Sequence, residues 1–166
     1  MAAYVHLLLA IASSEHEQQV GNEMNTQAMK SVGTVGPQAA HAPVILLVED
    51  EMVVREVTRQ VLQHAGYLVL ESSGPREALR LATKHHGRID LLLTDVVMPE
   101  MNGADLACRL HDIQPELRTV FMSGYAESDI AQSISRMSAL HIQKPFTVDG
   151  LLSRIGEALH ASLPAG

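Results

Sequence analysis

Cysteine is almost absent from this chain of 166 residues, which contains a single one, Cys108. One cysteine excludes a disulfide framework, and it also excludes a cysteine-rich zinc site. Basic residues are scarce as well: 12 Lys and Arg stand against 19 Asp and Glu, which gives a formal net charge of −7. A nucleic-acid-binding surface needs a basic stripe, so this balance argues against a nucleic-acid partner.

Long apolar runs are also missing. The apolar stretch at residues 1–12, MAAYVHLLLAIA, is shorter than the roughly 20 residues that a membrane-spanning helix needs. No Lys or Arg precedes it, so it lacks the charged start of a secretory signal peptide. We therefore expect a cytoplasmic protein with no membrane partner. Because residues 13–43 are polar and lack a period, we predict a poorly ordered N-terminal extension over 1–42 and one domain over 43–162.

Short apolar segments alternate with helical patterns from Pro43 onward. The apolar segments predict strands, and the patterns of period 3.6 predict helices. We expect strands at 44–48, 67–70, 89–94, 119–122 and 139–142, and helices at 53–65, 75–86, 102–112, 128–137 and 148–159, the last with Thr147 as its N-cap. Strict alternation predicts an α/β fold with a doubly wound parallel sheet of five βα units. Ligands of such sheets bind beyond the carboxyl ends of the strands.

Polar residues follow four of the five expected strands. Glu49 and Asp50 come after the first, Asp95 after the third, Ser123 after the fourth, and Lys144 after the fifth. Each has an ordinary structural explanation: an acidic cluster favours a helix N-terminus, Ser-Gly forms turns, and a lysine before proline suits a solvated loop. Their convergence at one edge of the sheet favours a functional site instead.

The residue types at this edge indicate phosphoryl transfer. Three close carboxylates repel one another unless a cation neutralises them, and an all-oxygen site suits Mg²⁺. Lys144 supplies a second, fixed positive charge. Cations that meet the charge of a transferred phosphoryl group, together with one accessible carboxylate, are the parts that this reaction needs. Asp95 is therefore the expected nucleophile, which would form an aspartyl phosphate.

Four motifs give the chain a family resemblance. They are LLVEDE (46–51), LLLTDVVMPEMNG (91–103), FMSGYAE (121–127) and HIQKPFT (141–147). With these motifs in this order, residues 44–159 resemble the receiver domain of two-component response regulators. The resemblance implies a flavodoxin-like fold with strand order 2-1-3-4-5. It also implies a phosphoacceptor that assists its own phosphorylation and dephosphorylation, rather than an enzyme.

The resemblance also implies a role for each site residue. Glu49, Asp50, Asp95 and the backbone carbonyl of Val97 match the Mg²⁺ ligands, and Asp95 matches the phosphoacceptor. Ser123 matches the hydroxyl residue that moves toward the phosphoryl group, and Lys144 matches the lysine that pairs with that group; the Lys144–Pro145 peptide bond is expected to be cis.

One position departs from the family pattern. His141 stands where the family usually has the aromatic residue of the conformational switch, three positions before the lysine. An imidazole there could make the response depend on pH, but the sequence favours a partly buried histidine without a switch role. His141 is thus a candidate switch residue rather than an assigned one.

The expected partners are a histidine kinase or histidine phosphotransfer protein, which supplies the phosphoryl group, and an unidentified downstream protein. Few residues follow the last expected helix, which favours a stand-alone receiver. Two alternatives remain. The first is a phosphate shuttle to a histidine phosphotransfer protein, because FMSGYAE and QKPFT are similar to receivers of hybrid histidine kinases. The second is a pseudo-receiver that binds partners without phosphorylation. A haloacid-dehalogenase-type phosphohydrolase is disfavoured, because Val97 stands where that class has a second acid.

Overall fold

The computed structural model describes residues 42–124 and 139–161. The expected N-terminal extension, apart from its last residue, and the expected helix at 128–137 lie outside these ranges. The described elements follow one another as β1 (Val44–Val48), α2 (Met52–His64), β2 (Leu68–Ser72), α3 (Pro75–Lys84), β3 (Leu91–Asp95), α4 (Gly103–Ile113), β4 (Arg118–Ser123), β5 (Leu140–Gln143) and α6 (Val148–His160).

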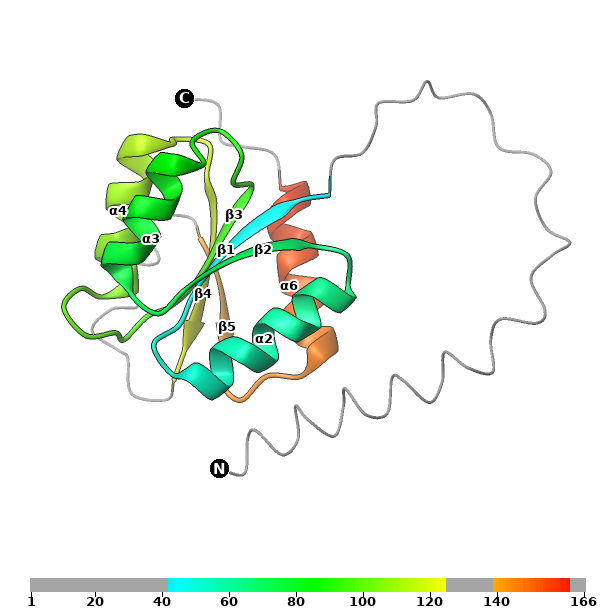
Figure 1. The fold of residues 1–166 in the computed structure, drawn as a ribbon. Helices are drawn as coiled ribbons and strands as arrows, with labels where there is room; N and C mark the ends of the chain where they lie inside the picture. The colour runs from blue at the N-terminus through cyan, green and yellow to red at the C-terminus, as the bar shows by residue number, and fades with distance from the viewer. Residues whose placement is uncertain (1–41, 125–138, 162–166) are drawn as a thin grey trace, which may run out of the picture.

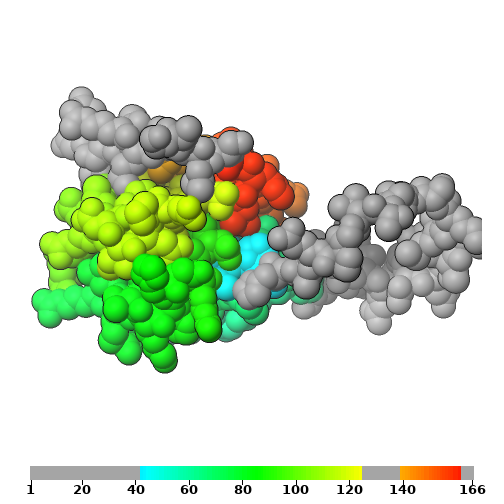
Figure 2. Space-filling model, turned by 90° about the horizontal axis from the view of Figure 1, so that it is seen from above, coloured from blue at the N-terminus to red at the C-terminus, as the bar shows by residue number. Residues whose placement is uncertain are grey.

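The five strands form one parallel sheet in the order β2-β1-β3-β4-β5. The predicted doubly wound fold and the strand order implied by the resemblance are therefore confirmed. Helices cover both faces of the sheet, with α3 and α4 on one face and α2 and α6 on the other (Figure 1). Figure 2 shows the surfaces of α3 and α4 in green and yellow-green, next to each other along one side of the molecule.

The central strands are apolar because both of their faces are covered. Every residue of β1 and β3 is buried, and alternate residues point into two separate core layers. Leu46 and Val48 pack with α3 and α4, whereas Ile45 and Leu47 pack with α2 and α6. The two layers fix the register of β1, because a shift by one residue would exchange its two faces.

Four of the five strands differ at their ends from the sequence prediction, and the carboxyl ends of β2 and β3 bear on the site. The sequence predicts β2 at 67–70, but the strand continues to Ser72, whose partner in β1 is Val48. It predicts β3 at 89–94, but the strand runs over 91–95, so that Asp95 itself pairs with Met122 of β4. In both cases the neighbouring strand pairs with the added residues through backbone hydrogen bonds, which polar and apolar residues form equally well. Asp95 is consequently held by the sheet rather than by a loop.

The last helix begins as its sequence predicts. Thr147 is the N-cap of α6, and its hydroxyl accepts a hydrogen bond from the Gly150 N–H at 3.1 Å. A cap of this kind satisfies one of the helix's free N–H groups. Among the described helices, none is long and apolar enough to cross a membrane.

Candidate functional site

Three carboxylates meet at the carboxyl ends of β1 and β3. Glu49 and Asp50 directly follow β1, and Asp95 is the last residue of the neighbouring strand β3. One oxygen from each of the three side chains lies within 4.8 Å of the others. Glu49 is 1% exposed and Asp95 is 9% exposed, whereas Asp50 is exposed to solvent. The cluster is thus set into the end of the sheet and open on one side.

Lys144 brings a positive charge to this cluster from the far side of the sheet. Its Nζ lies 2.6 Å from Oδ2 of Asp95 and 2.8 Å from Oε2 of Glu49. The residue follows β5, and its backbone N–H donates a 2.7 Å hydrogen bond to the Ser123 carbonyl at the end of β4. The Lys144–Pro145 peptide bond is cis, as the resemblance implies.

Burial changes the proton affinities of this group. It raises the pKa of the Glu49 carboxyl from 4.5 to about 7, because lost hydration outweighs the attraction of the Lys144 ammonium. Burial also disfavours the charged form of Lys144 and by itself would lower its pKa. The Glu49 and Asp95 carboxylates outweigh this effect and raise the pKa of Lys144 above its usual value. Lys144 is therefore charged at neutral pH, and Glu49 is poised between its two protonation states.

The remaining sequence-predicted residues differ in burial and in their distance from Asp95 along the sheet. Ser123 ends β4, is half-buried, and lies one residue beyond Met122, the β4 partner of Asp95. The Val97 N–H donates to Oδ1 of Asp95 at 3.2 Å, while the Val97 side chain is 56% exposed. His141 lies exposed in β5, paired with Phe121 of β4. The structure thus brings the Val97 N–H to the Asp95 carboxylate and places Ser123 at the end of the neighbouring strand, while His141 is exposed and not partly buried as expected.

Sequence reasoning missed a glycine that the site requires. A Cβ atom added to Gly103 would lie 2.2 Å from the carbonyl oxygen of Asp95, which is too close for any side chain. The Gly103 N–H also donates to the Val96 carbonyl at 2.8 Å, so the start of α4 lies directly against the end of β3. The MPEMNG segment contains this glycine, but only the tertiary contact explains why it is needed.

The donor atoms present fit a magnesium ion. Three carboxylates and one ammonium carry a formal charge of −2 when ionised, which a divalent cation would neutralise. All available ligand atoms are oxygens, and the exposed side of the cluster leaves room for the water ligands that Mg²⁺ usually keeps. Glu49, Asp50 and Asp95 are the groups that could hold it.

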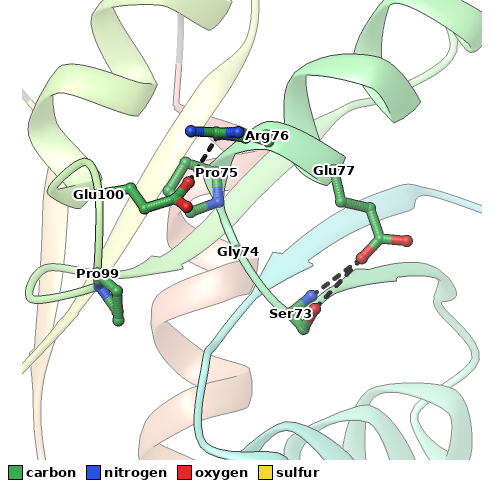
Figure 3. A pocket seen from close by; sticks show the side chains of 7 residues that line it. All are labelled: Ser73, Gly74, Pro75, Arg76, Glu77, Pro99 and Glu100. Carbon is green, nitrogen blue, oxygen red and sulfur yellow. Dashed lines mark hydrogen bonds and ion pairs between the residues drawn. The ribbon is translucent and has the colours of Figure 1, made fainter.

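A second hollow at the same edge of the sheet lies apart from this cluster. It is a pocket of about 280 Å³ between the start of α3 and the β3–α4 loop, lined by Ser73, Gly74, Pro75, Arg76, Glu77, Pro99 and Glu100 (Figure 3). Arg76 forms an ion pair with Glu100 at 2.8 Å, and the Ser73 N–H donates to the Glu77 carboxylate at 3.3 Å. Because these charged groups already pair with one another, we assign the pocket no part in the site.

Comparison with known proteins identifies the family. The model of the response regulator receiver domain matches residues 45–156. The chain belongs to this family. Receivers of this family are signalling phosphoacceptors rather than conventional enzymes, and the strand order of this sheet is that of the CheY-like, flavodoxin-like fold.

Three relatives show how far the likeness of this receiver extends. It is 37% identical over 116 residues to the sensor kinase CckA of Brucella abortus (strain 2308), covering 69% of this chain but only 12% of the kinase. It is 31% identical to the sporulation initiation phosphotransferase F of Bacillus subtilis (strain 168), over 69% of this chain and 92% of that protein. Among solved structures, the chemotaxis protein CheY4 of Vibrio cholerae superposes with a TM-score of 0.65 at 26% identity, over 72% of this chain and 100% of that one.

Proposed function

We propose that this receiver is a phospho-accepting response regulator in which Asp95 takes a phosphoryl group from a histidine kinase or a histidine phosphotransfer protein. The observation that carries the proposal is the pair of short contacts from Lys144 Nζ to Asp95 and Glu49, in a cluster of three carboxylates at the open edge of the sheet. A structural ion pair alone would not need the third, exposed carboxylate of Asp50.

The transfer forms a bond between a carboxylate oxygen of Asp95 and phosphorus, and it breaks the bond between phosphorus and the donor's imidazole nitrogen, which keeps the bonding electron pair. The product is an aspartyl phosphate. Lys144, already beside Asp95, is expected to pair with the phosphoryl oxygens. The Ser123 hydroxyl is expected to hydrogen-bond to them from the end of β4. Glu49, Asp50, Asp95 and the Val97 carbonyl would hold Mg²⁺, which would supply further positive charge to these oxygens when bound.

Phosphorylation would act on partners through a population shift. Movement of Ser123 toward the phosphoryl group would draw the end of β4 inward, and the neighbouring β5 with His141 would respond. An exposed His141 is compatible with a switch residue in its outward position. We propose that the receiver spans residues 43–162, that residues 1–42 form an extension, and that the protein works in the cytoplasm without nucleic-acid or membrane partners.

The decisive experiment is incubation with acetyl phosphate and Mg²⁺, followed by intact-mass measurement. Wild type should gain the mass of one phosphoryl group, Asp95→Asn should gain none, and the signal should vanish in EDTA. Asp112→Asn, which changes an exposed aspartate in the last turn of α4, is the matched control and should react like wild type. An unmodified wild type, with Mg²⁺ present and the fold intact, would favour the alternative of a pseudo-receiver that only binds partners.

A phosphate shuttle is the second candidate, supported by the likeness to a phosphotransferase over 92% of that protein's length. The shuttle and the response regulator can be distinguished by mixing the phosphorylated receiver with the histidine phosphotransfer proteins of its source organism and following the phosphate. Rapid loss of phosphate from the receiver with gain on the histidine protein supports a shuttle. Retention of the aspartyl phosphate supports a receiver that holds its signal and acts on a downstream protein.

A further inference from the structure

An arginine that sequence reasoning did not select contacts the loop that carries two of the three carboxylates. Arg55 lies in the first turns of α2, and its Nη1 donates to the Glu49 carbonyl at 2.6 Å and to the Asp50 carbonyl at 3.4 Å. Its own backbone N–H donates to the Glu51 carbonyl at 3.0 Å. One residue therefore engages the carbonyls of three successive loop positions. Arg55 as a whole is half-buried, and its guanidinium is hydrogen-bonded to the loop.

Glu49 has other contacts that hold it in place, but Asp50 depends on Arg55. The Glu49 N–H donates to the Ser72 carbonyl of β2 at 3.2 Å, and its carboxylate accepts from Lys144 at 2.8 Å. Asp50 is exposed and lies outside the strand, and the hydrogen bond from Arg55 ties its main chain to α2. Because Asp50 is the outermost carboxylate of the cluster, its position sets whether all three can share one ion.

We infer that Arg55 is a positioning residue for the metal site: its guanidinium fixes the backbone of Glu49 and Asp50 so that their carboxylates stay within reach of a common Mg²⁺. Both contacts come from one nitrogen, Nη1, and go to carbonyl oxygens, so Arg55 occupies neither of the two carboxylates that would bind the ion. Groups that orient metal ligands in this way typically account for about ten- to a hundredfold in metal affinity.

A role in positioning and a role through charge predict opposite results. A cation next to an Mg²⁺ site repels the ion, so removing the charge of Arg55 would by itself tighten Mg²⁺ binding. Removing a positioning contact instead leaves Asp50 free to move away from the cluster, which weakens binding. The sign of the change in Mg²⁺ affinity therefore separates the two.

The inference rests on the Mg²⁺ site of the proposed function, and the test begins with wild type to keep the two apart. Mg²⁺ is titrated into full-length protein, and the dissociation constant is measured from amide shifts in ¹H–¹⁵N NMR spectra. Thermal melting in EDTA follows fold stability separately. The variants are Arg55→Ala, Arg55→Gln and Arg55→Lys. The control is Arg59→Ala, which removes an arginine of the same helix whose contacts go to the side chains of Glu56, Gln63 and Glu71 and not to the loop.

Arg55→Ala and Arg55→Gln should bind Mg²⁺ about tenfold more weakly than wild type, while Arg59→Ala should bind like wild type. Arg55→Lys keeps the charge, but its side chain is one bond shorter and does not place a donor at the Nη1 position, so it should also bind more weakly than wild type. If Arg55→Ala does not fold, the Gln and Lys variants decide by the same criteria. Unchanged or tighter binding in the Arg55 variants overturns the inference but leaves the proposed function standing. A wild type that binds no Mg²⁺ refutes the proposed metal site, and the inference with it.

Discussion

Replacing Glu49 by Gln should change how the stability of this receiver depends on pH. Glu49 is 1% exposed at the end of β1, and its carboxyl has a pKa of about 7 instead of 4.5 because burial removes the hydration of the charged form. Gln has nearly the same shape as the protonated acid and does not ionise. Comparing the two proteins therefore isolates the free energy of ionising this one group inside the fold.

The sign follows from the direction of the pKa change. The unfolded chain loses the Glu49 proton near pH 4.5 and the folded protein near pH 7, so rising pH between these values favours unfolding. The favourable contribution is complete below pH 4.5 and is lost by the time the pH passes about 7. At about 1.4 kcal/mol per pKa unit, wild type should lose roughly 3 kcal/mol of unfolding free energy relative to Glu49→Gln. Lys144 adds nothing in this window, because its raised pKa lies above the ordinary 10.5.

Urea unfolding in EDTA, followed by far-ultraviolet circular dichroism from about pH 5 to about pH 8, measures this difference. Glu116→Gln, which changes an exposed carboxyl in the loop before β4, is the control, and its difference from wild type should stay level across the range. Added Mg²⁺ should reduce the loss in wild type, because the ion favours the ionised carboxylate. A stability difference between wild type and Glu49→Gln that does not change with pH, or that moves the other way, would refute burial as the cause of the raised pKa.

Two further substitutions test contacts around the same residues. Lys144→Met removes the ammonium that lies 2.6 Å from Asp95 and 2.8 Å from Glu49, and the uncompensated carboxylates should lower the unfolding free energy at neutral pH by about 3 kcal/mol, measured by urea unfolding. The loss should shrink on acidification, and a loss that is the same at all pH values would contradict the electrostatic cause. Gly103→Ala should lower the unfolding free energy by about 2 kcal/mol, because the new Cβ would lie 2.2 Å from the Asp95 carbonyl oxygen. Gly156→Ala, whose Cβ would meet nothing within 4 Å, should instead raise the melting temperature, and equal effects of the two substitutions would show that contact with β3 is not the cause.

Much of the fold can be predicted from the chain because its patterns are local. Apolar runs such as Val44–Val48, with no alternation of polar residues, indicate strands covered on both faces, and the periodic stripe that ends before Gly66 indicates the helix that follows. The ends of β2 and β3 are predicted less well. Ser72 and Asp95 belong to strands only because β1 and β4 lie beside them, and a neighbour in the sheet is not visible in the sequence.

The amino-acid sequence by itself determined which residues stand at the carboxyl ends of the strands, because a residue's place after a strand is a matter of chain position. It did not determine how those residues meet. The approach of Lys144 to Asp95, 49 positions earlier in the chain, requires β4 to lie between β3 and β5. The raised pKa of Glu49, the contact of Gly103 with Asp95, and the bonds from Arg55 to the loop all depend on burial and on distances between separate elements. Dehydration and close packing arise only when the layers come together, so these properties were decided by the tertiary structure.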